Sequence, residues 1–147
     1  MFEKYSENAR KVMSHARQEA QKLKHDHIGT EHILLGLIEV KGSIAAEILK
    51  NREIDLAHAK EQVKLLVKTD TGQVECDKWP RTNHAQIVLN DAVKEARQLK
   101  HNYIGTEHLL LGLLYENEGT GAKVIQNLGL KLSEIREDML RLLNRAS

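Results

Sequence analysis

The sequence predicts an all-α domain of eight helices, arranged as two four-helix repeats that are related by a pseudo-two-fold axis. The first observation behind this prediction is an internal repeat: residues 16–38 and 92–114 align at an offset of 76 and are identical at 15 of 23 positions. A repeat of this kind sets the architecture of a chain. The second observation is that aromatic residues make up only 3% of the sequence, while aliphatic residues supply most of its apolar content. This composition favours packed helices over a β-sandwich.

The length of 147 residues suits one ordinary domain with a substantial core. We expect repeat one to occupy residues 1–67, a polar linker to occupy residues 68–81 and repeat two to occupy residues 82–147. The linker holds the only proline and the only cysteine, Cys76. Trp79 either pins the linker onto the domain or, if exposed, serves as an interface anchor. Cys76 is interpreted as a bystander thiol.

The first helix of each repeat is long and has one buried face. Ser6 and Thr82 are its predicted N-caps. Apolar residues then recur at helical spacing in both repeats at equivalent positions. They are Ala9, Val12, Met13, Ala16, Ala20 and Leu23, with counterparts Ala85, Val88, Leu89, Ala92, Ala96 and Leu99.

The second helix of each repeat begins within the motif I-G-T-E-H, at residues 28–32 and 104–108. The motif supplies a chain-breaking glycine, a threonine that we predict as N-cap and a glutamate that we predict as the first helical residue. These residues are Gly29, Thr30 and Glu31 in repeat one and Gly105, Thr106 and Glu107 in repeat two. Because the helix that follows is apolar on most sides, it should be central.

The third and fourth helices complete each repeat. We expect the third helices at about residues 43–51 and 121–128, with Gly129 at the C′ position of the latter. Asp55 and Ser133 are the predicted caps of the fourth helices. The apolar stripes of the fourth helices are Ala59, Val63, Leu66 and Val67 in repeat one, and Ile135, Met139, Leu142 and Leu143 in repeat two.

Charge and apolar patterning exclude several classes of protein. The formal net charge is +1, with 22 basic and 21 acidic residues interspersed along the chain, so a nucleic-acid-binding surface is not expected. No apolar run reaches the length of a membrane span, and the start of the chain lacks the apolar region of a secretory signal. A single cysteine forms no internal disulfide, which makes the reducing cytoplasm the simplest expected location.

The doubled motif G-T-E-H-[I/L]-L-L-G-L, behind a start that reads MFEKYSENARKV, resembles the N-terminal repeat (Clp N or Clp R) domain of Clp/Hsp100 AAA+ unfoldases of the ClpC type. The resemblance covers essentially the whole chain. It implies a receptor module that recruits adaptor proteins and protein substrates to the AAA+ modules of an ATP-driven ring, which threads them into a protease. It also implies binding of arginine-phosphorylated proteins through one acidic residue in each repeat, here Glu31 and Glu107.

The first repeat departs from the family pattern in two places. Residues 39–43 lack the G-E-G turn that is usual in the family, whereas residues 116–119 of the second repeat stay closer to it. Arg52 and Glu53 replace the usual L-G pair, which the second repeat keeps as Leu128 and Gly129. These departures concern the first of the two implied binding sites and the adaptor surface.

The residues of the motif suit a phosphoarginine ligand on chemical grounds. A helix N-terminus with unpaired N–H groups attracts a phosphate, and a carboxylate accepts a guanidinium bidentately. Phosphoarginine carries both groups. The expected site residues are therefore Gly29, Thr30 and Glu31 with Gly105, Thr106 and Glu107, and Ser6 and Thr82 join them if the starts of the long helices converge there. The alternative is purely structural, because Gly-Thr-Glu is also a favourable helix start.

No catalytic residue, metal or other cofactor is expected. The pairs Glu31/His32 and Glu107/His108 lack H-E-x-x-H spacing, and adjacent residues point to different faces of a helix. Loop or capping histidines are the favoured interpretation, and a small metal-dependent hydrolase is the remote alternative. Residues 119–123 do not fit a phosphate-binding loop. The chain is therefore interpreted as a binding module, expected to be monomeric in isolation. It is either an excised domain or a stand-alone peptide-binding relative without an ATPase.

Overall fold

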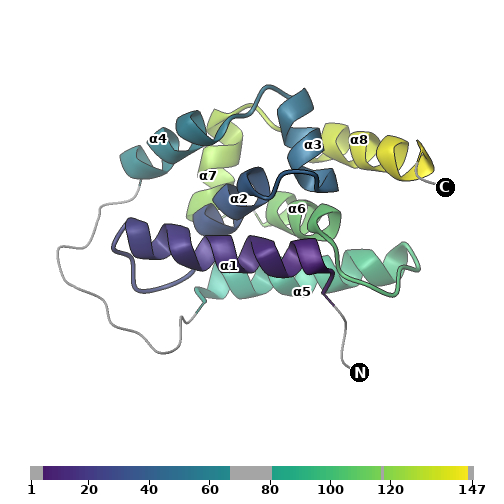
Figure 1. Cartoon of the computed structure of the whole chain (residues 1–147), viewed down its shortest axis with the longest axis horizontal. Helices are drawn as coiled ribbons and strands as arrows, with labels where there is room; N and C mark the ends of the chain where they lie inside the picture. The colour runs from purple at the N-terminus through teal and green to yellow at the C-terminus, as the bar shows by residue number, and fades with distance from the viewer. Residues whose placement is uncertain (1–4, 67–80, 117, 146–147) are drawn as a thin grey trace.

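The computed structural model describes residues 5–66, 81–116 and 118–145. These residues form eight α-helices and no strand, so the predicted all-α class is confirmed (Figure 1). The helices are α1 (Glu7–Lys22), α2 (Thr30–Glu39), α3 (Ile44–Asn51), α4 (Leu56–Leu66), α5 (Asn83–Gln98), α6 (Thr106–Tyr115), α7 (Thr120–Asn127) and α8 (Leu132–Arg145). No helix of the described residues is both long and apolar enough to cross a membrane.

The two repeats have the same helix order and equivalent contacts. Helices α2 and α6 lie in the middle of the molecule, with α1 and α5 on one side and α3, α4, α7 and α8 on the other (Figure 1). Helix α1 packs along α2, and α5 packs along α6 in the same way. The outer helices pair across the repeats, α3 with α8 and α4 with α7. The core is aliphatic, and its largest fully buried side chains come mainly from α2 and α6.

The long helices begin where the sequence predicts. Ser6 Oγ accepts a hydrogen bond from the Ala9 N–H at 3.1 Å, and Thr82 Oγ1 accepts one from the Ala85 N–H at 3.1 Å. Both residues are therefore N-caps. Gly129, with φ of 77°, follows α7 at the predicted C′ position, a conformation that glycine adopts without strain.

The second helices begin one residue earlier than predicted. Their N-caps are Gly29 and Gly105, both in extended backbone, and Thr30 and Thr106 are already helical. The threonine assignment is therefore wrong, because each threonine hydroxyl accepts an N–H from the other repeat rather than from its own helix.

The third and fourth helices show smaller differences. Helices α3 and α7 begin at Ile44 and Thr120, and Asp55 Oδ1 accepts the His58 N–H at 2.7 Å as a cap should. Ser133 is not the cap of α8, which begins at Leu132 with the Lys131 carbonyl accepting the Ile135 N–H at 3.1 Å.

Two expectations for the end of repeat one have different outcomes. Leu66 is 41% exposed and so does not belong to the buried stripe of α4. Val67 and the proposed linker with Cys76 and Trp79 lie outside the described residues, apart from Arg81.

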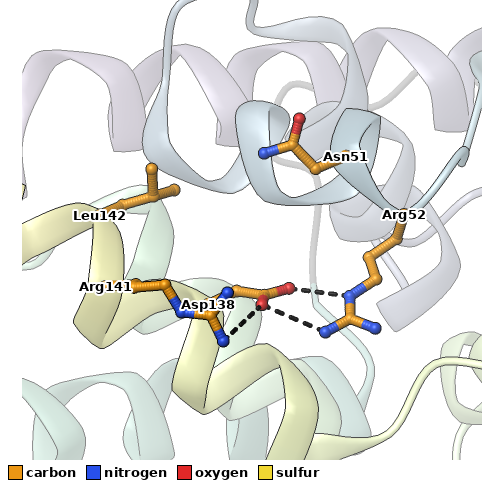
Figure 2. A pocket seen from close by; sticks show the side chains of 5 residues that line it. All are labelled: Asn51, Arg52, Asp138, Arg141 and Leu142. Atoms are coloured by element: carbon orange, nitrogen blue, oxygen red, sulfur yellow. Dashed lines mark hydrogen bonds and ion pairs between the residues drawn. The ribbon is translucent and has the colours of Figure 1, made fainter.

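Arg52, one of the departures from the family pattern, joins α3 to α8. Its guanidinium donates to both oxygens of Asp138, at 2.8 and 3.1 Å, and to Glu134 Oε2 at 3.0 Å. Figure 2 shows the Arg52–Asp138 pair at one side of a cavity of about 300 Å³, which Asn51, Arg141 and Leu142 also line. The charged residue at this position therefore fixes a contact between the two repeats.

Candidate functional site

The two I-G-T-E-H motifs lie at corners where helix starts from both repeats converge. Corner one is the start of α2 at residues 29–31, together with the starts of α5 and α7. Its backbone link is the Thr82 N–H, which donates to the Ile28 carbonyl at 3.0 Å. The link to α7 is the Gly121 N–H, which donates to Thr30 Oγ1 at 2.7 Å. Three helix N-termini therefore point their N–H groups toward one region of the molecule.

Corner two is the pseudo-symmetric equivalent. It is the start of α6 at residues 105–107, together with the starts of α1 and α3. The Ser6 N–H donates to the Ile104 carbonyl at 2.8 Å, and the Ala45 N–H donates to Thr106 Oγ1 at 3.2 Å. Each corner therefore draws residues from both repeats, and neither repeat alone contains one.

The structure gathers the eight sequence-predicted site residues at the two corners, and each corner combines the motif of one repeat with the long-helix start of the other. Ser6 lies at corner two beside the second motif, and Thr82 lies at corner one beside the first. The hydroxyls of both residues already accept N–H groups of their own helices. Their main contribution in the described structure is thus to bring a helix start to the corner rather than to offer a free side chain.

Glu31 and Glu107 are buried at these corners, with exposed fractions of 7% and 3%. Each carboxylate folds back over the glycine that precedes its helix, where a Cβ on Gly29 or Gly105 would overlap a carboxylate oxygen. Glycine therefore leaves room for the carboxylate in this position, and a larger residue would displace it. In the described residues neither carboxylate has a lysine or arginine within ion-pairing distance.

The two carboxylates have different hydrogen-bond partners. Burial raises the pKa of Glu31, and bonds from its own backbone N–H and from the Thr120 hydroxyl oppose that rise. At corner two the Tyr103 hydroxyl donates to Glu107 Oε2 at 3.0 Å. Burial, together with the Glu107 charge, raises the pKa of Tyr103 to about 12. The phenol therefore stays protonated and remains a donor.

A buried histidine completes each helix start. His32 Nδ1 accepts the Gly29 N–H at 2.8 Å, so the ring proton is on Nε2, which donates to His25 Nδ1 at 2.7 Å. His108 and His101 make the same pair of contacts in repeat two. Burial lowers the pKa of His32 to about 3 and that of His108 to about 4. These are capping histidines, as the sequence favoured.

Other residues of the corners were not predicted from the sequence. Tyr103 and Thr120 contact the carboxylates, and Glu116 and His84 flank corner one. The sequence does mark Tyr103, because it lies directly before the second motif at a position where the two repeats differ, its counterpart being His27. Among the described residues, no group of three or more histidine, cysteine, aspartate or glutamate side chains is arranged to hold a metal.

Fold and corners together define a duplicated helical repeat domain. The family model for the Clp repeat (R) N-terminal domain matches residues 4–81 and again residues 81–147. The chain belongs to this family.

Curated relatives agree with the family match. The chain is 47% identical over 143 residues to an ATP-dependent Clp protease ATP-binding subunit ClpA homolog of Guillardia theta, covering 97% of the chain and 17% of the relative. It is 47% identical over 142 residues to chaperone protein ClpC1, chloroplastic, of Arabidopsis thaliana, covering 97% of the chain and 15% of the relative. The chain therefore spans less than a fifth of these relatives. Since some relatives are named as chloroplastic, family membership does not by itself support the cytoplasmic expectation.

Solved structures share the fold. The N-terminal domain of the chaperone ClpD from Arabidopsis thaliana superposes with a TM-score of 0.77 at 24% identity, covering 96% of this chain and 95% of that one. The N-terminal domain of Hsp104 from Candida albicans gives a TM-score of 0.77 at 22% identity, covering 95% and 91%. At this level of identity the likeness supports the eight-helix, two-repeat architecture alone.

Proposed function

We propose that this chain is the substrate- and adaptor-recruiting N-terminal domain of a ClpC-like ATP-dependent unfoldase, and that it binds arginine-phosphorylated proteins through its two corners. Family membership and the relatives' names support the first part of this proposal. The observation that carries the second part is the pair Glu31 and Glu107. Each is a carboxylate more than nine-tenths buried, without a lysine or arginine partner in the described residues, where three helix starts meet.

The proposed binding step is an exchange of partners at the carboxylate. In the described structure Glu31 bonds its own backbone N–H, so the carboxylate occupies the positive end of the α2 dipole. A phosphoryl group has more charge and more acceptor oxygens, and takes that place. The displaced carboxylate then accepts the guanidinium of the same ligand bidentately. One ligand therefore satisfies both the helix start and the buried acid.

Calorimetric titration with phosphoarginine tests this proposal. Glu31→Ala and Glu107→Ala should each remove one site, and the double variant should not bind. Losing a carboxylate that holds a desolvated guanidinium costs roughly 2–5 kcal/mol, which is a loss of at least about thirtyfold.

Glu7→Ala is the matched control. Glu7 is also a first-turn glutamate, on a helix that begins at corner two, but its side chain is 86% exposed and lies beside Lys11. Stability should change little in all of these variants, since a first-turn glutamate contributes only about 0.3–1 kcal/mol through the helix dipole. Binding that persists in the double variant would show that Glu31 and Glu107 are helix-start residues only.

A further inference from the structure

The two corners are equivalent in backbone but not in charge. At the repeat offset of 76, Tyr103 corresponds to His27, Thr120 to Ile44, Glu116 to Val40 and His84 to Asn8. The two corners therefore differ at four positions around the motif, although the motif itself, residues 28–32 and 104–108, is identical in both repeats. The differences decide which groups a ligand would meet at each corner.

Corner two holds one carboxylate in a fixed position. Tyr103 donates to Glu107 at 3.0 Å, and the ring of Tyr103 also packs against His101 and His108. The start of α3 beside it is capped by a neutral group: Ser43 Oγ accepts the Ala46 N–H at 3.1 Å and donates to the Val40 carbonyl at 2.8 Å. A phosphoryl group at corner two would therefore meet hydroxyls and N–H groups, with Glu107 as the one buried acid among the described residues there.

Corner one carries a second carboxylate. Glu116 accepts the Gly119 N–H at 2.7 Å and the Glu118 N–H at 2.9 Å, so an acid holds the turn directly before α7, whose N-cap Gly119 replaces Ser43 of α3. Glu116 Oε1 and Thr30 Oγ1 each lie 2.8 Å from the point where a Cβ on Gly119 would stand. The second acid therefore adjoins the motif itself. Its side chain is only 4% exposed, and His84 Nδ1 lies 2.9 Å from its other oxygen.

The repeat-one counterpart of Tyr103 does not reach the acid. His27 is paired with its neighbour Asp26 at the surface instead. Glu31 takes its hydroxyl bond from Thr120 of the other repeat. The position of Glu31 therefore depends on α7, and Glu116 holds the turn directly before that helix.

We propose that the corners have diverged, so that corner two is the tighter phosphoarginine site, while corner one discriminates less between phosphoarginine and unmodified arginine. This inference rests on the proposed function. Tyr103 is a positioning residue that presets Glu107, and Glu116 is the residue that sets the specificity of corner one, because it repels a phosphoryl dianion but not a guanidinium. A like charge at the rim of a partly buried site weakens binding by about tenfold.

Titrations of the whole chain with phosphoarginine and with arginine test the proposal, at about pH 8, above the ordinary titration range of imidazole. The wild-type protein should show two phosphoarginine affinities that differ by about tenfold. Glu107→Ala should remove the tighter site and Glu31→Ala the weaker one. Glu116→Gln, which removes the charge and keeps one of the two acceptor oxygens, should strengthen the weaker site several-fold and leave the tighter one unchanged.

Tyr103→Phe should weaken only the tighter site, by about threefold to tenfold, while the ratio of phosphoarginine to arginine affinity at the weaker site stays fixed. His27→Tyr offers the reciprocal change at corner one and should strengthen that site. The melting temperature of each variant reports whether it folds.

The divergence of the corners and the proposed function are contradicted by different results. Equal affinities at both sites, or no response to Glu116→Gln, would overturn the divergence while leaving the proposed function intact. Absence of phosphoarginine binding to the wild-type protein, or binding that survives loss of both Glu31 and Glu107, would overturn the proposed function and this inference with it.

Discussion

His32 and His108 give the protein a built-in sensitivity to acid at the scale of single residues. Their pKa values are lowered by burial to about 3 and about 4, whereas an unfolded histidine titrates near 6.5. The unfolded state therefore binds more protons below about pH 6.5, so their contribution to stability is complete above that pH and is lost as the pH falls toward the folded values. Between pH 6.5 and pH 5 each histidine should remove about 2 kcal/mol from the free energy of unfolding.

Urea unfolding at pH 7 and pH 5 measures this loss. His32→Gln and His108→Gln are the matched variants, because a glutamine at this position can still accept the N–H of the N-cap. Each should remove roughly half of the pH dependence. The raised pKa of Glu31 acts in the opposite direction, because a carboxyl group that protonates more readily when folded adds stability as the pH falls. An unchanged pH slope in both glutamine variants would contradict the prediction.

Single residues also show where sequence reasoning succeeded and where it failed. Ser6 and Thr82 were recognisable as caps because a hydroxyl before an apolar-periodic segment has one dominant local use. Thr30 and Thr106 carry the same local signal, yet their hydroxyls accept N–H groups from residues 91 and 61 positions away. Local chemistry cannot distinguish these two uses, because the second depends on tertiary packing.

At the scale of elements, the long helices approach the central helices closely at two glycines. A Cβ on Gly36 would lie 2.5 Å from the Val12 carbonyl oxygen, and one on Gly112 would overlap the Val88 carbonyl oxygen. Both obstacles are backbone atoms, so the helices must move apart to accept alanine. We expect Gly36→Ala and Gly112→Ala each to lower the free energy of unfolding by about 1–3 kcal/mol.

Gly29→Ala is the informative comparison for that measurement. There a Cβ meets the end of the flexible Glu31 side chain, which can rotate away. Its unfolding midpoint in urea should therefore change less than that of Gly36→Ala, although phosphoarginine binding at corner one should weaken. A larger loss of stability in Gly29→Ala than in Gly36→Ala would show that the carboxylate is more tightly held than its contacts indicate.

The contact between α3 and α8 depends on charge, whereas the equivalent contact between α7 and α4 does not. Arg52 joins Asp138 and Glu134 in the first, and its counterpart Leu128 is apolar. Arg52→Leu should lower the melting temperature at low salt, and the difference from wild type should shrink at about 1 M salt, where surface ion pairs are screened. A difference that is independent of salt would assign the effect to packing.

The helices themselves were predictable because their apolar register recurs at a fixed offset through both repeats. Ala9 with Ala85 and Val12 with Val88 are buried alike. The end of α4 was not predictable in the same way. Leu66 has the correct spacing for burial, but it lies on the last described turn before the linker and remains 41% exposed. Periodicity reports which face of a helix is apolar, and not how far along that face a neighbour extends.

At the scale of the whole molecule, the corners could not be derived from the repeat. The internal repeat predicts that both halves carry the same helix start. It also leads one to expect that the contacts of each helix start come from its own repeat. The structure instead completes the start of α2 with helices of repeat two, and that of α6 with helices of repeat one. The exchange is invisible in the sequence because every contact joins residues that the offset does not relate.

The crosswise contacts predict that the two repeats unfold together. Thr30→Val and Thr106→Val remove the hydroxyls that accept the Gly121 and Ala45 N–H groups, and leave each donor buried without its partner. Each change should cost about 1–3 kcal/mol. Because each bond joins one repeat to the other, the loss should appear in a single transition of the whole domain rather than in one half of it.

Denaturant unfolding followed by helix content, and hydrogen exchange measured separately for α1–α2 and α5–α6, check this prediction. Thr30→Ser is the matched control, because it keeps the acceptor oxygen and should stay close to wild type. If Thr30→Val instead released α7 alone, while exchange in α5 and α6 kept its wild-type rate, the repeats would be independent folding units. Corners one and two would then be contact sites between separate units rather than parts of one cooperative core.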